Sequence, residues 1–345
     1  MKKVYVIISN GMAGIQTYES NLVKLLNNKK KDVYIINNKK KNPNNWKNRK
    51  LLTHYYSKTI WHPFKIIEYL YIIKKKNSKA NITFIISNPA ILVMYFFFIK
   101  FFLKNKRIIM VMHSHITNSS ILQIIVGFVS SIMCNFIDKV IFVSKFTLNW
   151  WCKYFYFFKY TKYIVVHNFV YCRKKKLVKL SQDNFKIGFV GRLDKEKGFY
   201  KFLEIAKFIK NIKFKFFVYG NRNFKTKGEK KIKFCGWKDS DAIYKNINLL
   251  VVTSPIENCP FNVLESKING IPTLSLSDGG IKEIIKNNQD GILLKHNSSL
   301  NLIKSKIDYI KENYDYFSKN CHIGAKKFNI LLLGKKYQSF FKFLI

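Results

Sequence analysis

The chain has 345 residues, of which 48% are hydrophobic, and its 62 Lys and Arg against 19 Asp and Glu give a formal net charge of +43. This length suffices for two domains that each bury a core, and the low Gly and Pro content excludes a collagen-like or largely disordered chain. The charge predicts attraction to polyanions, either nucleic acid or an anionic lipid leaflet, although a coding bias toward Lys, Asn, Ile and Phe is an alternative source of it.

The start of the chain has two lysines and then five apolar residues before Ser9-Asn10-Gly11. This apolar run is too short for the core of a signal peptide, so we interpret residues 4–8 as a first buried strand. The six cysteines lie far apart without a C-x-x-C pair. This spacing is typical of reduced thiols in a cytoplasmic protein.

The first half of the chain alternates apolar runs of strand length with helical patterns, which predicts βαβ units and a parallel sheet. The predicted elements are a strand at 4–8, a glycine loop at 9–14, a helix at 15–27, and strands near 33–37, 82–86, 107–112, 139–143 and 163–166. A polar, lysine-rich stretch from Arg173 to Asn184 then predicts a linker.

Two segments of this half are rich in apolar and aromatic residues. Ile91–Leu103 has thirteen residues, which as a helix is about 20 Å long against roughly 30 Å for a bilayer core. Pro89 prevents its extension toward the N-terminus, so we expect no membrane span. Trp150–Tyr160 mixes aromatic rings with lysines, which suits a lipid headgroup layer. We expect these segments to touch a membrane surface, and the alternative is that they are core helices.

The second half repeats the α/β pattern and predicts a second parallel sheet. Its predicted elements are strands at 186–190, 214–219, 232–235, 248–252 and 272–275, with helices at about 198–210 and 261–269. A helical pattern fills 298–320, and an aromatic, basic tail follows it.

Two motifs of the first half are candidates for ligand contact. Gly11-Met12-Ala13-Gly14 lies between a strand and a helix, where glycines let the backbone approach a phosphate, but a plain tight turn is an equal alternative. Its spacing is not G-x-G-x-x-G, which disfavours a dinucleotide fold. His113-Ser114-His115 follows a predicted strand, so His113 would project into the crevice where α/β sheets bind ligands. There it would hydrogen-bond a sugar or phosphate or exchange protons near neutral pH, unless the pair is structural.

Two further motifs lie in the second half. Arg192 and Lys197 flank a turn before a helix, so both cations can converge on a diphosphate leaving group; a solvated charge cluster is the alternative. Glu257 and Glu265 are eight residues apart, the first in a turn marked by prolines and the second just over one turn into an apolar helix. The helix N-terminus attracts an anion and the two carboxylates accept hydroxyl groups, which together suit a sugar nucleotide.

Asp239-Ser240-Asp241 has the D-x-D form of metal-dependent sugar transferases. It precedes a helical pattern, so we interpret it as a helix N-cap and expect no metal.

Taken in order, these motifs resemble the retaining glycosyltransferases of the GT-B fold, in the large family called glycosyl transferases group 1 (family four). The resemblance covers nearly the whole chain, and its most specific part is Arg192 with Lys197 followed by Glu257 with Glu265. Supporting matches are the first glycine loop, Phe142-Val143-Ser144, His167-Asn168-Phe169-Val170, Gly270-Ile271-Pro272, and Gly279-Gly280 with Glu283.

The resemblance implies an α/β fold of two Rossmann-like domains that face each other across a cleft. The expected bounds are 1–172 for an acceptor- and membrane-facing domain, 173–184 for the linker, 185–325 for the donor-binding domain, and 326–345 for a C-terminal helix that packs back on the first domain. The family retains the anomeric configuration and needs no metal, so no metal or cofactor is expected beside the nucleotide-sugar donor.

By the same resemblance, Arg192 and Lys197 would hold the donor diphosphate. Glu265 would bind the ribose hydroxyls, and Glu257 would face the transferring sugar. The remaining expected contacts are backbone N–H groups at the start of a helix, a glycine that lines the phosphate from the first domain, and a histidine at the reacting centre: Phe261, Asn262, Val263, Gly14 and His113.

The sequence departs from the family pattern at three places. Glu257-Asn258-Cys259-Pro260 replaces the frequent Glu-Gly-Phe-Gly, and Tyr219-Gly220-Asn221 replaces Gly-x-Gly. The first glycine pair is stretched to Gly11-Met12-Ala13-Gly14.

We therefore expect a cytoplasmic enzyme, peripheral on the inner face of the cytoplasmic membrane. It would move a hexose from a UDP- or GDP-linked donor to a lipid-linked or surface-polysaccharide acceptor, in capsule, O-antigen or lipopolysaccharide biosynthesis. One alternative is a basic nucleic-acid-binding protein, but the charge is dispersed and no binding module is apparent, so no specific nucleic acid partner is expected. The other is a degenerate transferase-like scaffold, against which the intact charged motifs argue.

Overall fold

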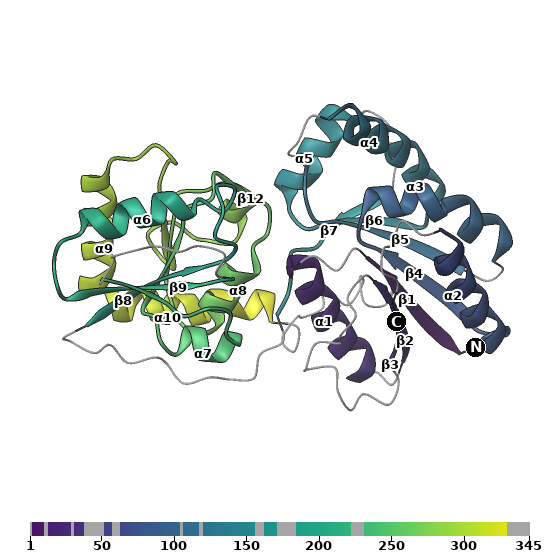
Figure 1. The fold of residues 1–345 in the computed structure, drawn as a ribbon, viewed down its shortest axis with the longest axis horizontal. Helices are drawn as coiled ribbons and strands as arrows, with labels where there is room; N and C mark the ends of the chain where they lie inside the picture. The colour runs from purple at the N-terminus through teal and green to yellow at the C-terminus, as the bar shows by residue number, and fades with distance from the viewer. Residues whose placement is uncertain are drawn as a thin grey trace. The chain divides into compact units, whose positions relative to one another are not determined.

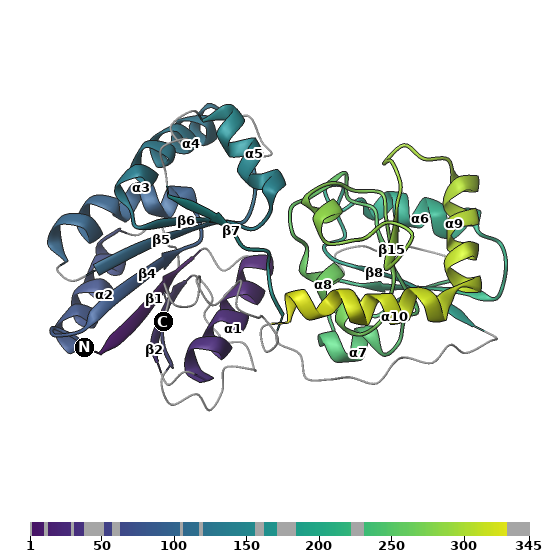
Figure 2. The same ribbon diagram turned by 180° about the vertical axis from the view of Figure 1, so that it is seen from behind.

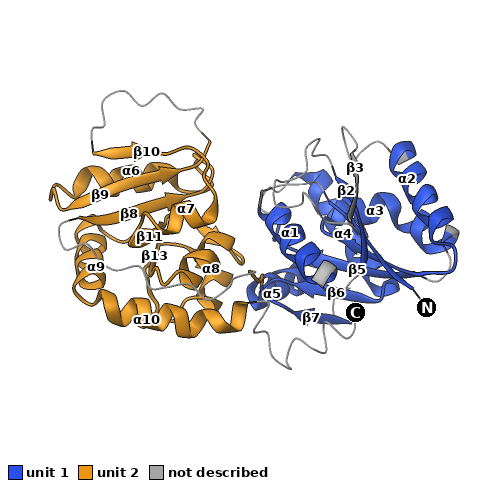
Figure 3. Cartoon of the chain, turned by 90° about the horizontal axis from the view of Figure 1, so that it is seen from below, with its two compact units in different colours: residues 1–167, 334–345 blue, residues 168–333 orange. Residues whose placement is uncertain are grey.

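The computed structural model describes residues 2–9, 13–28, 31–37, 52–56, 63–103, 106–116, 120–155, 162–170, 184–221 and 231–329. The chain forms two compact units, unit 1 with residues 1–167 and 334–345 and unit 2 with residues 168–333 (Figure 3). The predicted linker, apart from Asn184, and the predicted C-terminal helix beyond Asn329 lie outside the described residues.

Unit 1 is built on a parallel sheet of seven strands in the order β3-β2-β1-β4-β5-β6-β7. Each strand is an apolar run, and helices cover both faces, with α1 on one face and α3 and α4 on the other (Figure 1). This two-sided cover explains why β1 buries five consecutive residues rather than alternate ones. The strands are β1 (Lys3–Ile8), β2 (Asp32–Asn37), β3 (Leu52–Tyr56), β4 (Asn81–Ile86), β5 (Lys106–Met112), β6 (Lys139–Phe142) and β7 (Tyr163–Val165).

The helices of unit 1 follow the strands in the βαβ manner, and Figure 2 shows them from behind. They are α1 (Ala13–Asn28), α2 (Pro63–Lys76), α3 (Pro89–Phe97), which continues as the π-helix η2 (Phe98–Phe102), α4 (Ile121–Met133), which ends in the 3-10 turn η3 (Cys134–Phe136), and α5 (Lys145–Tyr154). The sequence analysis predicted the strands except β3, but it did not separate α2 or α4 as helices.

The first predicted membrane segment lies mostly in the core of unit 1. Helix α3 begins where Asn88 Oδ1 accepts from the Ala90 N–H at 2.8 Å and Pro89 takes the first helical position. Within the predicted segment from Ile91, the buried side chains are Ile91, Leu92, Tyr95, Phe96, Ile99 and Leu103. Burial against the sheet therefore explains most of its apolar character.

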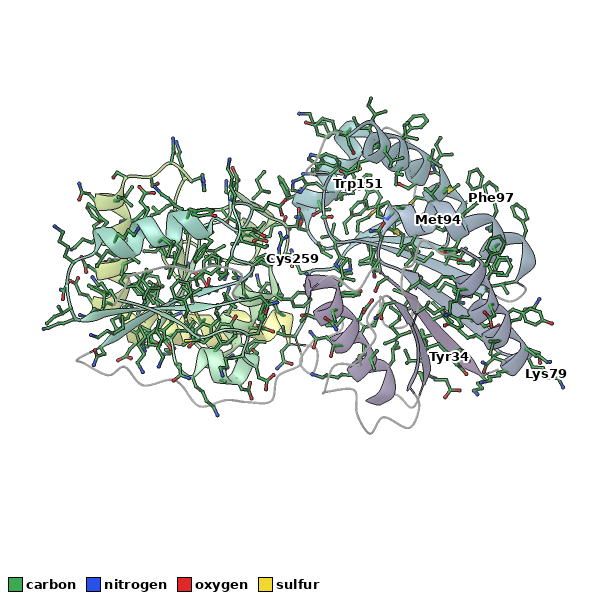
Figure 4. All side chains as sticks on the ribbon, viewed as in Figure 1. Tyr34, Lys79, Met94, Phe97, Trp151 and Cys259 are labelled. Atoms are coloured by element: carbon green, nitrogen blue, oxygen red, sulfur yellow. The ribbon has the colours of Figure 1, made fainter. Side chains whose placement is uncertain are left out.

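The second aromatic segment begins in α5, where Trp151 is buried and Trp151 Nε1 donates to the Ser114 carbonyl at 3.0 Å (Figure 4). Phe155 is also buried, and residues 156–160 lie outside the described residues. Among the described residues, no helix is both long enough and apolar enough to cross a membrane.

Unit 2 has a parallel sheet of six strands in the order β10-β9-β8-β11-β13-β15, and a separate pair of short strands, β12 and β14. The strands are β8 (Phe185–Val190), β9 (Phe214–Tyr219), β10 (Ile232–Phe234), β11 (Leu249–Val252), β12 (Ile256–Glu257), β13 (Thr273–Ser275), β14 (Asp278–Gly279) and β15 (Gly291–Leu293). Its core is rich in phenylalanine, with edge-to-face pairs such as Phe185 with Phe214.

The helices of unit 2 are α6 (Phe199–Phe208), α7 (Ser240–Tyr244), α8 (Phe261–Ile268), α9 (Leu300–Glu312) and α10 (Tyr314–Ala325). The helical pattern predicted at 298–320 is thus two helices, because the chain turns at Asn313, which ends α9 and precedes α10. The described cysteines, Cys134, Cys152, Cys235, Cys259 and Cys321, are free thiols.

Candidate functional site

The turn between β8 and α6 carries Arg192 and Lys197. Gly198, the N-cap of α6, has φ 67°, and a Cβ there would lie 2.0 Å from the Thr253 carbonyl oxygen. Glycine is therefore required for the turn to lie directly against the end of β11. Thr253 Oγ1 donates to the Lys197 carbonyl at 3.4 Å. This contact brings Lys197 next to the loop that carries Glu257.

Lys197 and Glu257 are in direct contact. Lys197 Nζ donates to Glu257 Oε1 at 2.6 Å, and Ser254 Oγ donates to the same oxygen at 2.8 Å. The Glu257 side chain is 10% exposed and that of Lys197 is 35% exposed, so the pair is buried on one side and open on the other. A buried carboxylate needs such partners, since burial without them disfavours its charge.

Short strands hold Glu257 in place. Glu257 in β12 is opposite Gly279 in β14, so the predicted Gly279-Gly280 turn lies beside this carboxylate. Ser277 Oγ lies 3.0 Å from Ser254 Oγ, and Ser277 therefore supports the serine that contacts Glu257. Gly279 has φ 92°, a conformation in which a side chain would be strained.

Arg192 lies in the same turn but has its own partners. Its guanidinium is 2.6 Å from Glu196 and 3.1 Å from Asp194, and its side chain is 55% exposed. The hydrogen bond that Arg192 donates to Glu196 contributes most to a raised pKa of Arg192, and the charges of Asp194, Glu196 and Glu257 act in the same direction. Arg192 is thus an exposed cation within the field of Glu257.

The first turn of α8 follows Pro260, its N-cap residue. Asn262 Nδ2 donates to the Val190 carbonyl at 2.9 Å, and Tyr244 Oη donates to the Asn262 carbonyl at 2.8 Å. Asn262 Oδ1 is buried without a hydrogen-bond partner. The side chain of Asn262 thereby joins α8 to the end of β8, so the start of α8 and the Arg192–Lys197 turn are held together. The N–H groups of a first helical turn have no partners within the helix and attract anions.

Glu265 lies one turn further along α8, beside Tyr244. Burial raises the pKa of Tyr244 well above its usual value, and the nearby Glu265 carboxylate raises it further. The hydroxyl therefore stays protonated and available as a donor. Asn269 Nδ2 donates to the Glu265 carbonyl at 2.7 Å, which closes the end of the helix.

The Asn258-Cys259-Pro260 segment, where the family frequently has Gly-Phe-Gly, is held by Asn168. The Asn168 N–H donates to Cys259 Sγ at 3.2 Å, and Asn168 Nδ2 donates to the Cys259 carbonyl at 2.6 Å. Cys259 is buried (Figure 4), and burial raises the pKa of its thiol, so the thiol is neutral. Cys259 is therefore a structural part of the loop that follows Glu257.

In unit 1, His113 follows β5 and its ring makes an edge contact with Tyr18, with the ring centroids 4.7 Å apart. His113 Nε2 is buried without a hydrogen-bond partner, and burial lowers the pKa of His113 to about 3. The imidazole is consequently neutral at physiological pH. Hydrogen bonding to a ligand suits this state, whereas the proton exchange near neutral pH that the sequence suggested does not.

Gly14 is the second residue of α1, and a Cβ added to it would have no neighbour within 4 Å. The space beside Gly14 is thus open within unit 1. Gly11 and Met12 lie outside the described residues.

The D-x-D sequence lies at the start of α7. Asp239 is the N-cap residue as predicted, although its side chain makes no capping hydrogen bond. Among the described residues, no group of three or more His, Cys, Asp or Glu side chains is placed to hold a metal ion.

Sequence reasoning placed Lys197 and Glu257 in one region but did not identify their direct contact, nor the roles of Ser254, Ser277 and Asn168. Short polar residues in loops carry no periodic signal, so the pairing of β12 with β14 was the information that was lacking.

Comparisons with known proteins identify relatives of part of the chain and of its fold. Residues 173–328 match the family model "Glycosyl transferases group 1". A curated protein of Campylobacter jejuni is 31% identical over 128 residues, which are 34% of this chain and 36% of that protein; it is the GalNAc-α-(1→4)-GalNAc-α-(1→3)-diNAcBac-PP-undecaprenol α-1,4-N-acetyl-D-galactosaminyltransferase. The match thus spans about a third of that relative's length.

The fold of the chain has many solved relatives. Sucrose-phosphate synthase from Thermosynechococcus elongatus superposes with a TM-score of 0.77 at 14% identity, covering 99% of this chain and 100% of that one. HepE from Anabaena in complex with UDP-glucose gives a TM-score of 0.76 at 14% identity with the same coverage. The lipopolysaccharide outer core galactosyltransferase WaaB gives 0.71 at 17% identity, covering 99% of this chain and 100% of that one.

Residues 173–328 are a domain of the glycosyl transferases group 1 family, in a chain that has the GT-B fold.

Proposed function

We propose that the chain is a retaining, metal-independent hexosyltransferase that takes its sugar from a UDP- or GDP-linked donor. The observation that carries this proposal is the contact of Lys197 with Glu257 at 2.6 Å, beside the exposed Arg192 and within the domain of the family match. In the absence of a ligand, Glu257 balances the charge of Lys197. A donor diphosphate would offer Lys197 a second anionic partner and leave Glu257 oxygens for sugar hydroxyls.

The chemistry follows from the charges. A nucleoside diphosphate leaving group gains negative charge as the glycosidic bond breaks, and positioned cations stabilise that charge without reorganising. Lys197 and Arg192 would supply these cations, with the N–H groups of Phe261, Asn262 and Val263 as additional donors at the start of α8. Glu265 would accept ribose hydroxyls, and in unit 1 Gly14 and His113 are the residues proposed to contact substrate.

The proposed acceptor is a lipid-linked or surface-polysaccharide glycan, of the capsule, O-antigen or lipopolysaccharide type, with the enzyme peripheral on the inner face of the cytoplasmic membrane. Two comparisons support this choice of acceptor. The Campylobacter relative is named for an undecaprenol-linked acceptor, and WaaB is named as a lipopolysaccharide galactosyltransferase. A UDP donor is supported by HepE, whose structures contain UDP or UDP-glucose.

The first test is binding of UDP, GDP and their sugars by thermal shift and calorimetry in the presence of EDTA. Stabilisation by one nucleotide would identify the base and a metal-independent donor site, whereas no response to any of them would contradict the proposal. Product anomers determined by NMR would then test retention.

The matched variants for this test are Lys197→Met and Lys195→Met, because both lysines lie in the same turn and Lys195 is exposed. Loss of one charge-assisted contact weakens binding by about 1.5–3 kcal/mol, so we expect Lys197→Met to raise the Kd for the nucleotide roughly 10- to 100-fold. Lys195→Met should leave it nearly unchanged. Equal effects of the two variants would show that Lys197 acts only through general charge.

A further inference from the structure

Helix α4 distributes its large apolar residues in the opposite way to an ordinary surface helix. Its inward side holds mostly small residues, with Gly127, Ser130 and Ser131 buried together with Met133 at its end. The serine hydroxyls are satisfied within the helix, since Ser130 Oγ donates to the Gly127 carbonyl at 3.0 Å and Ser131 Oγ to the Phe128 carbonyl at 2.7 Å. A Cβ on Gly127 would lie 2.5 Å from the Phe155 ring, so the helix packs closely through this glycine.

The outward side of α4 holds the large aliphatic and aromatic residues. Ile121 is 77% exposed and Leu122 is 71% exposed. Ile124, Ile125 and Phe128 are also exposed, to a smaller extent. The sequence of α4 has no charged residue. A helix at a water-facing surface normally has the opposite distribution, because burying a large aliphatic side chain stabilises by about 1.5–3 kcal/mol.

The neighbouring elements continue this apolar surface. Helix α3 packs beside α4 (Figure 1), and its exposed residues Met94, Phe97 and Phe101 recur at the spacing of one helix face. Phe97 projects from the outer side of α3 in Figure 4 and stacks on Phe101, with ring centroids 6.1 Å apart. Lys100 Nζ donates to the carbonyl of the exposed Phe136 at 2.7 Å, which ties η2 to the turn after α4. We name this surface the α3–α4 face; it comprises Met94, Phe97, Phe101, Ile121, Leu122, Ile124, Ile125, Phe128 and Phe136.

The charge around the α3–α4 face is one-sided. Between Glu68 and Asp183 the sequence contains one acidic residue, Asp138. That carboxylate accepts from the Ile108 N–H at 2.8 Å and so serves the backbone. Basic side chains lie beside the apolar surface. Lys100 in η2 contacts the Phe136 carbonyl, and Lys106 in β5 is close enough to Lys100 and to Lys74 of α2 to interact electrostatically with both. Apolar residues rimmed by cations are complementary to an anionic lipid surface.

We propose that the α3–α4 face docks on an anionic lipid bilayer, with the outward residues of α4 entering the headgroup layer. At thirteen residues, α4 is about 20 Å long and lies in the plane of the interface rather than across the bilayer. This proposal rests on the proposed function, because an enzyme with a lipid-linked acceptor has to reach a membrane.

Co-sedimentation with vesicles of phosphatidylcholine, with and without phosphatidylglycerol, tests this surface without donor or acceptor. We expect the protein to bind the vesicles that contain phosphatidylglycerol and to lose part of this binding at high salt. The variant Leu122→Gln/Ile125→Gln should bind at least about tenfold more weakly, because two large apolar contacts are lost. The control Ile212→Gln/Ile323→Gln changes residues of unit 2 with 80% and 55% exposure and should bind like the unchanged protein.

Three outcomes would overturn the proposal: no vesicle binding by the unchanged protein, equal binding by the α4 variant, or a concentration-dependent dimer that the α4 variant abolishes while vesicle binding is absent. If the α4 variant does not fold by circular dichroism, Phe97→Gln/Phe101→Gln gives an independent reading of the same face. Measuring the Kd for UDP distinguishes a failure of this proposal from a failure of the proposed function. The α4 variant should keep the nucleotide Kd, whereas a protein that binds vesicles but no nucleotide would contradict the donor site alone.

Discussion

At the residue scale, the proposed donor site depends on backbone positions as much as on charged groups. Gly198 allows the Lys197 turn to lie against Thr253, and Gly279 allows β14 to lie beside Glu257. The charged residues would be present in the sequence without these glycines, but they would not meet. Glycine at these positions is thus part of the site.

Gly198 and Gly14 make a matched pair for substitution by alanine. At Gly198 the positive φ and the Thr253 carbonyl at 2.0 Å from the added Cβ leave no room, and we expect Gly198→Ala to destabilise unit 2 by about 2 kcal/mol or more. At Gly14 the added Cβ meets no atom within 4 Å, so Gly14→Ala should leave the melting temperature the same or slightly higher.

Thermal unfolding followed by circular dichroism measures both effects. If Gly14 lines the donor phosphate, Gly14→Ala should also lower transfer although the protein is folded. Unchanged transfer would remove Gly14 from the site, and a stable Gly198→Ala would contradict the described turn.

A second residue-scale prediction concerns Glu19, which is fully buried in α1. Burial raises the pKa of Glu19 to about 7, although Ser9 and Asn37 beside it act in the opposite direction. Because the folded pKa lies above the ordinary value of 4.5, the stability that protonation provides is complete below pH 4.5 and is lost as the pH rises through about 7. The full change is on the order of 3 kcal/mol.

Unfolding by urea at pH 6.5 and at about pH 8.5 tests this linkage, and about 1 kcal/mol of the loss falls between these two pH values. His113 does not interfere in this window, since its lowered pKa affects stability only as the pH falls below its ordinary value of 6.5. Glu19→Gln should be less sensitive to pH than the unchanged protein and more stable at the higher pH. Parallel pH profiles of the two proteins would show that Glu19 does not titrate in this range.

The sequence predicted which residues carry charge at the site, because Arg192, Lys197, Glu257 and Glu265 stand at a spacing that a turn and a helix start impose. It did not predict that Lys197 contacts Glu257, since sixty residues separate them in the chain and they meet because the Gly198 turn packs against Thr253. The neutral state of His113 was also beyond sequence reasoning, because it results from burial against neighbours distant in the chain.

At the element scale, a buried ion pair fixes the position of α8. The lysine of this pair follows Glu265 in the helix. Lys267 Nζ lies 2.7 Å from Asp290 Oδ2, with side chains 2% and 1% exposed, and it also donates to the Ile284 carbonyl at 2.5 Å. The Lys286 N–H donates to Asp290 Oδ1 at 2.8 Å. The pair thus joins α8 to the segment that precedes β15.

Removing one partner should leave a buried charge uncompensated. We expect Asp290→Ala to cost about 3–5 kcal/mol of unfolding free energy, and Lys267→Met/Asp290→Leu to cost less than the single change. The control is Asp308→Ala, since the Lys304–Asp308 pair of α9 is 43% and 32% exposed and contributes under about 1 kcal/mol. Urea unfolding measures all three, and equal costs for Asp290→Ala and Asp308→Ala would contradict a structural role of the buried pair.

The longer elements could be predicted because apolar periodicity and caps mark them, as at Asn88 and Pro89 before α3. Strands β12 and β14 have two residues each, which is too short for a periodic signal. Helix α4 was not recognised because its pattern is inverted, so its apolar residues do not indicate a buried face.

At the scale of the whole molecule, each unit has a hydrophobic cluster of its own. The cluster of unit 1 includes Phe84, Tyr95 and Trp151, and the cluster of unit 2 includes Phe185, Phe202 and Phe317. Each unit is therefore large enough to unfold cooperatively by itself.

We expect two transitions in differential scanning calorimetry. At about pH 8.5 Glu19→Gln should raise the transition of unit 1 alone, because it removes a buried charge. Asp290→Ala should lower the transition of unit 2 alone, and at 3–5 kcal/mol the shift is about 6–20 °C for a domain of this size. A single transition that moves with both variants would show that the units unfold together.

In α4, the residues that stabilise the fold are different from the residues that form the proposed membrane surface. Its inward contacts are made mainly by small residues together with Val129 and Met133, whereas its outward residues touch little of the fold. Mutations at Ile121, Leu122 or Ile125 can therefore accumulate without loss of stability. Substitutions there can consequently change the membrane attachment of such a chain, in evolution or by design, without changing its proposed donor site.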